Sequence, residues 1–133
     1  MEPVPMFSSH GRIALVTGAA TGLGQAIAVA LARNGADLVI SDKPDVSLDT
    51  TRGLIAPYAR RVFAVPIDVR VPQQILVGAA TIEREFGRVD ILVNNAGINR
   101  PTAPLDVTTD NWDDHFHTNV RGGFLMTQAV AKG

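Results

Sequence analysis

The eight residues TGAATGLG, from Thr17 to Gly24, are the stretch that decides the fold. A short apolar run, residues 12–17, leads into them, and its length and flanking glycines favour a buried parallel strand. A helical pattern follows directly, with an apolar face at Leu23, Ile27, Ala30 and Leu31. A glycine-rich turn between a buried strand and a helix is typical of a site for dinucleotide phosphates.

The loop glycines and the start of the helix explain how such a turn would bind phosphate. One glycine makes the tight turn, one lets the main chain approach the pyrophosphate, and one lets the helix pack closely on the strand. The helix N-terminus adds free N–H groups and a partial positive charge of about half an electron. The octet alone would also fit a purely structural turn. The predicted cofactor-binding residues here are Thr17, Gly18, Thr21, Gly22, Leu23 and Gly24.

An acidic residue ends the next apolar run, residues 37–41. This residue, Asp42, lies 18 positions after Gly24 (42 − 24). A carboxylate at this point can accept hydrogen bonds from both hydroxyls of an adenosine ribose. It would repel the 2′-phosphate of NADP by about 1 to 4 kcal/mol per unit charge near 4 Å. We therefore predict NAD as the cofactor and NADP as the weaker ligand. The alternative is a solvated loop aspartate.

The glycine spacing resembles the TGxxxGxG signature of the short-chain dehydrogenase/reductase family. Two later segments agree with that family in order and spacing. Asp68 and Val69 follow an apolar run at residues 61–65, where the family has an acidic residue that meets the adenine ring. An Asn-Asn-Ala-Gly segment, residues 94–97, follows residues 89–93, and its Asn95, Ala96 and Gly97 are further candidates for cofactor binding.

A last match lies in the segment His-Thr-Asn-Val, residues 117–120. Asn119 falls where the family places the asparagine of its catalytic tetrad. The resemblance implies an oxidoreductase that moves a hydride between a nicotinamide dinucleotide and a small alcohol or carbonyl substrate. It also implies that the helix carrying Asn119 lines a subunit interface. Asn119 is the only tetrad member that we assign in this chain.

The other catalytic groups of the family are a serine and a Tyr-x-x-x-Lys pair. Tyr58 is the only tyrosine, and Val62 stands four residues after it. A tyrosine with a pKa near 10 is a poor base at neutral pH without an adjacent cation. We therefore expect the chain to be part of an enzyme and to be inactive by itself. The alternative is an inactive nucleotide-binding fragment or a decayed gene product.

Composition sets limits on the other functions. At 133 residues the chain fits one domain, residues 11–133, preceded by a flexible tail at residues 1–10. The net charge of −1 gives no reason to expect a nucleic acid partner, and no apolar stretch is long enough to enter a membrane as a span. The absence of cysteine fits a reducing compartment, so we expect a cytoplasmic protein. No metal site is expected, because His115 and His117 would point to different faces of a helix.

Alternating apolar patterns predict an α/β fold of the Rossmann type, a doubly wound parallel sheet with strand order 3-2-1-4. Further helices are predicted at residues 47–58, 72–86 and 111–132, with a loop at residues 99–109. Ending at Gly133, the sheet would leave its fourth strand as an apolar edge. We therefore expect self-association, either through this edge or through the stripe around Trp112, Phe116 and Val120.

Overall fold

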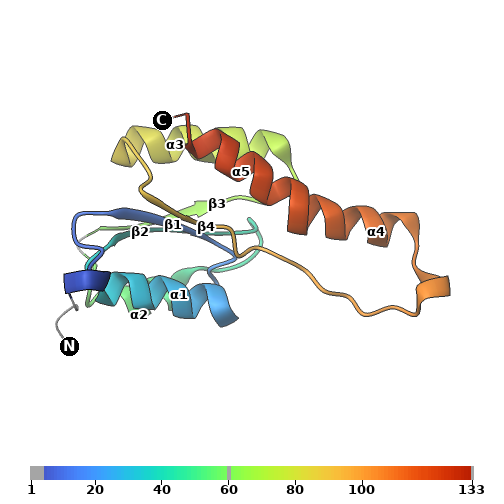
Figure 1. The fold of residues 1–133 in the computed structure, drawn as a ribbon, viewed down its shortest axis with the longest axis horizontal. Coiled ribbons are helices and arrows are strands. Elements are labelled where there is room, and N and C mark those ends of the chain that lie inside the picture. The colour runs from blue at the N-terminus through green and yellow to red at the C-terminus, as the bar shows by residue number, and fades with distance from the viewer. Residues whose placement is uncertain (1–4, 60, 133) are drawn as a thin grey trace.

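The computed structural model describes residues 5–59 and 61–132. Four parallel strands form one sheet, and helices cover both of its faces (Figure 1). The strand order is β3-β2-β1-β4, which confirms the predicted Rossmann-type order. The strands are β1 (Ile13–Thr17), β2 (Asp37–Asp42), β3 (Val62–Pro66) and β4 (Ile91–Val93). The helices are α1 (Gly22–Arg33), α2 (Asp49–Ile55), α3 (Pro72–Phe86), α4 (Thr109–Phe116) and α5 (Gly123–Val130).

The central strand β1 is buried at every position because helices pack on both faces of the sheet. Its residues alternate between two apolar cores. Leu15 belongs to the core beneath α3 and α5, where it lies opposite Val39 of β2 and Leu92 of β4. Ala14 and Val16 belong to the core beneath α1 and α2. This two-sided burial explains why the strand has a continuous apolar run.

Strand β4 is shorter than the predicted run of residues 89–93. Asp90 pairs with Ile13 through both its main chain and its side chain: its N–H donates to the Ile13 carbonyl oxygen at 2.9 Å, and its Oδ2 accepts the Ile13 N–H at 2.8 Å. Arg88 donates to the same carboxylate at 3.0 Å. These contacts, led by the Ile13 hydrogen bond, lower the pKa of Asp90. A charged side chain therefore anchors the start of β4, and only its last three residues form regular strand.

Helix α3 has the predicted bounds, with Pro72 in its first turn and Gly87 as a left-handed C-cap at φ 79°. Helix α2 is shorter than the predicted residues 47–58. Pro57 lies two residues beyond its end and has no N–H with which to continue the helix. The predicted loop at residues 99–109 contains a short 3-10 turn, Pro104–Asp106, and projects from the body of the molecule (Figure 1).

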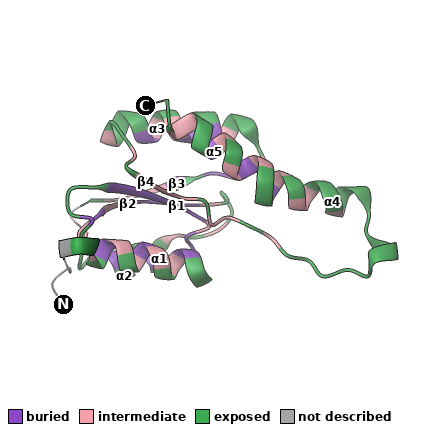
Figure 2. Cartoon of the chain, in the orientation of Figure 1, coloured by how far each residue is buried: buried purple, intermediate pink, exposed green. Residues whose placement is uncertain are grey.

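The prediction of one continuous helix at residues 111–132 was wrong in its start and in its continuity. The helical stretch starts at Thr109 and is interrupted by a π-helical segment, η3 (His117–Gly122), between α4 and α5. The stripe for which self-association is predicted lies at the surface, since Trp112, Phe116 and Val120 are 58%, 47% and 59% exposed. None of residues 109–116 is buried, and α4 extends beyond the sheet (Figure 2).

A different row of residues on this helical stretch faces inward. Thr118, Gly122 and Met126 are buried at a spacing of four residues. Gly122 lies against the loop after β3, where an added Cβ would be 2.9 Å from the Val69 carbonyl oxygen. A side chain at position 122 would collide with this loop, so glycine is what allows the helix to approach it this closely.

Residues 1–4 of the expected tail lie outside the described residues. Further along it, the Ser9 N–H donates to the Asn34 carbonyl oxygen at 2.7 Å. The Ser9 side chain is buried against the body of the domain. Within the described residues, no helix has the length and apolarity needed to cross a bilayer.

Candidate functional site: a cleft at the carboxyl ends of the strands

A cleft of about 390 Å³ opens where the four strands end. This is the edge of a parallel α/β sheet at which ligands bind, because the loops after the strands leave a crevice there. Nine predicted cofactor residues line it: Gly18, Thr21, Leu23, Asp42, Asp68, Val69, Asn95, Ala96 and Gly97. Six further lining residues were not predicted: Lys43, Ile67, Arg70, Ile98, Arg100 and Thr118.

The glycine-rich turn has the backbone geometry that phosphate binding requires. Gly18 and Gly22 have positive φ angles of 62° and 58°, which favour glycine. An added Cβ at Gly22 would meet nothing within 4 Å, so the main chain there faces open space. Thr21 caps α1 in an extended conformation, and its side chain makes no capping hydrogen bond. The first N–H groups of the helix are therefore free to bind an anion.

Gly24 has a packing role rather than a place in the cleft lining. An added Cβ would overlap the Gly18 carbonyl oxygen and lie 2.5 Å from Asn95 Nδ2. Only a glycine lets the first turn of α1 approach the end of β1 this closely. This corresponds to the helix-packing role expected of one loop glycine.

Asp42 lies at the end of β2 with its carboxylate held in place. Oδ2 accepts the Ala20 N–H at 3.0 Å, and Oδ1 accepts the Lys43 N–H at 2.9 Å. Each carboxylate oxygen can accept a further hydrogen bond. The glycine-rich turn and the acidic residue therefore form one unit, with the carboxylate beside the phosphate loop.

Thr17 and Asn95 hold the loops after β1 and β4 together. Asn95 Nδ2 donates to the carbonyl oxygens of Thr17 and Gly18, both at 3.1 Å. Thr17 Oγ1 accepts the N–H groups of Asn95 and Ala96 at 3.1 and 3.0 Å. Thr17 is buried and does not line the cleft. Its role is to position the loop at residues 94–97.

Asn119 also acts on a loop. Its Oδ1 accepts the Ile98 N–H and its Nδ2 donates to the Ile98 carbonyl oxygen, both at 2.8 Å. The side chain therefore binds the main chain that follows the Asn-Asn-Ala-Gly segment, and it does not line the cleft. Fixing Ile98 in this way shapes the wall of the cleft beside Gly97.

Two arginines share one carboxylate at the rim of the cleft. Arg70 binds Asp68 at 2.8 Å and Asp114 of α4 at 3.5 Å, and Arg100 binds Asp114 at 2.9 Å. Hydrogen bonding by Arg70 holds the pKa of Asp68 below its usual value. The sequence could not reveal this network, because its members come from two loops and a helix that only the fold brings together.

His115 is half-buried and connects α4 to the same loop. Its Nε2 accepts the Arg100 N–H at 3.0 Å, and its Nδ1 lies 2.7 Å from the Asn111 carbonyl oxygen. No cluster of three or more potential metal ligands occurs among the described residues.

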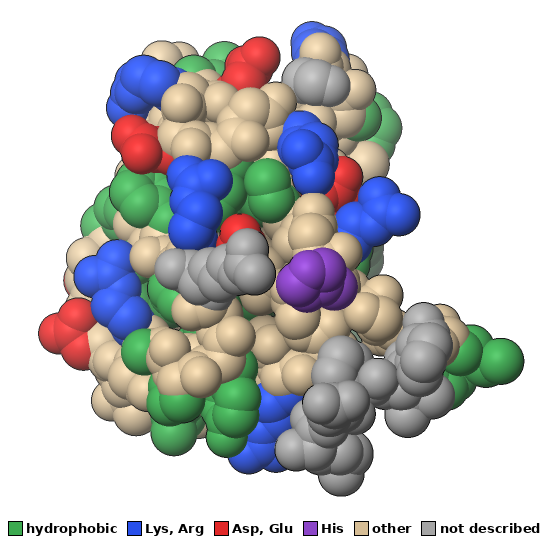
Figure 3. All heavy atoms as spheres, turned by 90° about the vertical axis from the view of Figure 1, so that its left-hand side faces the viewer, with side chains coloured by type: hydrophobic (Ala, Val, Ile, Leu, Met, Phe, Trp, Pro, Cys, Tyr) green, Lys and Arg blue, Asp and Glu red, His purple; other side chains and the backbone are tan. Residues whose placement is uncertain are grey.

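The opposite end of the sheet differs in character from the cleft. Figure 3 shows basic and acidic side chains intermixed on this end. Arg12 and Arg88 both pair with Asp90 there, at 3.9 and 3.0 Å.

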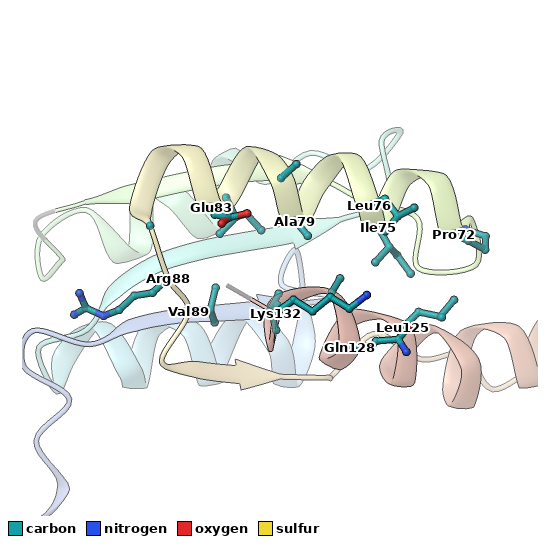
Figure 4. A pocket seen from close by; sticks show the side chains of 15 residues that line it. Pro72, Ile75, Leu76, Ala79, Glu83, Arg88, Val89, Leu125, Gln128 and Lys132 are labelled. Atoms are coloured by element: carbon teal, nitrogen blue, oxygen red, sulfur yellow. The ribbon is translucent and has the colours of Figure 1, made fainter.

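A second cavity lies between α3 and α5 (Figure 4). Apolar side chains such as Ile75, Leu76 and Leu125 make up much of its lining. Arg88 and Val89, which precede β4, also line it. It therefore reaches the amino end of that strand, where parallel sheets do not place nucleotides.

Comparisons with known proteins identify the family of the chain. The sequence profile of the short chain dehydrogenase family matches residues 12–133. Gluconate 5-dehydrogenase of Gluconobacter oxydans (strain 621H) is 39% identical over 132 residues, which cover 99% of this chain and 52% of that protein. The chain thus spans about half the length of the relatives that it matches.

Solved structures show the same arrangement. A short-chain type dehydrogenase/reductase from Mycobacterium marinum has a TM-score of 0.89 and 34% identity, covering 95% of this chain and 51% of that one. L-sorbose reductase from Gluconobacter frateurii, in complex with NADPH and L-sorbose, has a TM-score of 0.87 and 27% identity over 94% of this chain and 48% of that one. The chain belongs to the short-chain dehydrogenase family.

Proposed function

We propose that the chain carries the NAD-binding part of an oxidoreductase that transfers a hydride between nicotinamide and an alcohol or carbonyl carbon. The observation that carries this proposal is Asp42. Its carboxylate is fixed by the Ala20 N–H beside a glycine turn that has the open, positive-φ backbone of a phosphate site. This combination fits the ribose and the phosphates of one dinucleotide.

Different residues of the cleft bind different parts of the cofactor. The N–H groups at the start of α1 hold the pyrophosphate, and Asp42 accepts the hydroxyls of the adenosine ribose. Asp68 and Val69 contact the adenine, and Ala96 and Gly97 leave room for the nucleotide to lie along the main chain. The nicotinamide of bound NAD would accept the hydride. Asn119 corresponds to the family's tetrad asparagine and positions the loop through Ile98.

A second candidate is a nucleotide-binding protein without turnover. The position of Tyr58 favours it for the 133-residue chain. Tyr58 packs 5.2 Å from the Arg33 guanidinium, at the end of α1 that is remote from the cleft. The 12 residues of α1 separate the two ends by about 18 Å. Tyr58 therefore cannot supply a proton to a substrate beside the nicotinamide.

Cofactor preference tests the role of Asp42. We expect the chain to bind NAD at least about 5-fold more tightly than NADP, since 1 to 4 kcal/mol of repulsion corresponds to about 5- to 1000-fold. Asp42→Asn keeps a side-chain oxygen that can accept the Ala20 N–H but removes the negative charge. The ratio of NAD affinity to NADP affinity should therefore decrease. Isothermal titration with both dinucleotides measures it.

The matched control for this experiment is Asp45→Asn. It removes the same charge from an exposed residue that does not line the cleft, and it should leave the preference unchanged. Tighter binding of NADP than of NAD by the unmodified chain would contradict the assignment. Lys43, which also lines the cleft, would then be the residue that attracts the 2′-phosphate.

We also propose that the chain associates with itself. Two apolar surfaces support this proposal. Strand β4 pairs with β1 alone among the described residues, which leaves its outer edge open. On the helical side, Trp112 and Phe116 stack at 4.7 Å between ring centroids, and both are about half exposed with Val120 beside them. Contiguous exposed aromatics of this kind mark interaction surfaces.

Light scattering at increasing concentration should show a mass above that of the monomer. Replacing Phe116 and Val120 together by serine should lower that mass if the helical surface is responsible, and should leave it unchanged if the β4 edge is. Leu105→Ser is the control, because Leu105 is 99% exposed but lies in the projecting loop. A monomer at every concentration would contradict both routes.

The remaining assignments rest on composition. With no cysteine in 133 residues, the chain suits a reducing compartment, and we propose a cytoplasmic location. A net charge of −1 favours a small-molecule ligand over nucleic acid as the partner.

A further inference from the structure

Thr118 has an unusual hydroxyl. The residue is 7% exposed, and within residues 5–59 and 61–132 its Oγ1 has no hydrogen-bond partner. Buried polar atoms are nearly always paired, so an unpaired one in a native structure calls for an explanation. Thr118 also lines the cleft at the ends of the strands.

Other helical threonines show what Thr118 would do in an ordinary helix. Thr81 donates to the Val77 carbonyl oxygen at 2.9 Å, and Thr127 donates to the Gly123 carbonyl oxygen at 2.8 Å. Both bonds reach back four residues, which is the usual local partner for a threonine in a helix. Thr118 lies in the π-helical segment η3, where the turn is wider, and its hydroxyl does not make this bond.

The neighbours of Thr118 place it at one end of the cleft. Asn119, directly after Thr118, binds the main chain of Ile98. Gly122, four residues after Thr118, packs against Val69. Thr118 therefore lies between the loop after β3 and the loop after β4, and both loops line the cleft with it. Under the proposed function, this is the end that receives the adenine.

We propose that the Thr118 hydroxyl hydrogen-bonds the adenine base of the dinucleotide. A hydroxyl can donate and accept, and adenine presents both an amine and ring nitrogens at its edge. The interrupted helix then has a chemical consequence: it keeps the hydroxyl from bonding to its own backbone and leaves it for the ligand. This inference rests on the proposed cofactor function.

The test compares Thr118→Val with Thr118→Ser in titrations of NAD, ADP and nicotinamide mononucleotide. Valine has nearly the shape of threonine but no hydroxyl, so it should weaken NAD and ADP binding by about 3- to 10-fold. Nicotinamide mononucleotide, which lacks adenine, should bind all variants alike. Serine should keep NAD affinity within about twofold. Thr109→Val, an exposed threonine at the start of α4, is the control.

Thermal unfolding without nucleotide separates binding from packing. Thr118→Val should unfold at the same or a higher temperature, because it removes a buried unpaired hydroxyl. A lower temperature, with serine and valine losing affinity equally, would show a packing role and overturn the inference. Unchanged NAD and ADP affinity in Thr118→Val would overturn it too, while leaving the cofactor assignment intact. Failure of the unmodified chain to bind NAD or ADP would overturn both.

Discussion

The purified 133-residue chain should show no measurable oxidation of alcohols or reduction of carbonyls with NAD or NADH. General acid–base catalysis is typically worth about 100- to 10,000-fold, and it needs a group within hydrogen-bond reach of the reacting oxygen. Tyr58 lies at the far end of α1, and Asn119 has both polar groups of its side chain bound to Ile98. Neither can transfer that proton.

The absorbance of the reduced nicotinamide measures the turnover, with a panel of polyols and sugar acids as test substrates. Gluconate 5-dehydrogenase of Gluconobacter oxydans, assayed with gluconate, is the positive control. Tyr58→Phe tests whether the Tyr58 hydroxyl acts as a proton donor. We expect the variant to be as inactive as the unmodified chain. Turnover that purifies with the chain and falls in this variant would mean that Tyr58 reaches the substrate after all.

Gly24→Ala should destabilise the domain by about 2 to 3 kcal/mol and abolish NAD binding. The new Cβ would overlap the Gly18 carbonyl oxygen and lie 2.5 Å from Asn95 Nδ2, so backbone must move. Overpacking of this kind typically costs 1 to 3 kcal/mol, a large share of the roughly 5 to 15 kcal/mol that stabilises a domain. Because Asn95 also binds Thr17 and Gly18, the shift would disturb both loops that line the cleft.

Urea unfolding followed by circular dichroism measures the loss of stability, and titration with NAD measures binding. Gly53→Ala is the matched control. Gly53 is an exposed residue inside α2, and an added Cβ there would meet nothing within 4 Å. This change should stabilise the chain by about 0.5 to 1 kcal/mol, because alanine is the better helix former. A Gly24→Ala chain with normal stability and normal NAD affinity would show that the loop tolerates a side chain.

The two glycine substitutions are also informative about the link between fold and site. In this chain the phosphate loop, the strand ends and the Asn-Asn-Ala-Gly segment share hydrogen bonds through Thr17 and Asn95. A change that moves the glycine turn therefore acts on binding through the same contacts that stabilise the domain. Stability and affinity should fall together in Gly24→Ala, whereas Thr118→Val should lose affinity without losing stability.

Local patterns predicted most of the fold. The apolar runs predicted all four strands, since a strand buried on both faces needs a continuous apolar sequence. Helix α3 was predicted to the residue, because Pro72 and Gly87 are strong boundary signals. The glycine turn, Asp42 and the Asn-Asn-Ala-Gly segment were found because each is contiguous and follows a strand. The start of β4 was missed because the acceptor for the Ile13 N–H is the Asp90 side chain.

The sequence by itself determined the order of strands and helices, the position of the glycine-rich turn and the family, because these depend on short-range spacing and on the period of apolar residues. The tertiary structure alone decided which polar groups meet. Arg70, Arg100 and Asp114 are more than ten residues apart and become partners only when the loops and α4 converge. The burial of Thr118 and the bond between Asn119 and Ile98 likewise depend on segments that are distant in the sequence. Contacts of this kind form between distant segments, and no local pattern encodes them.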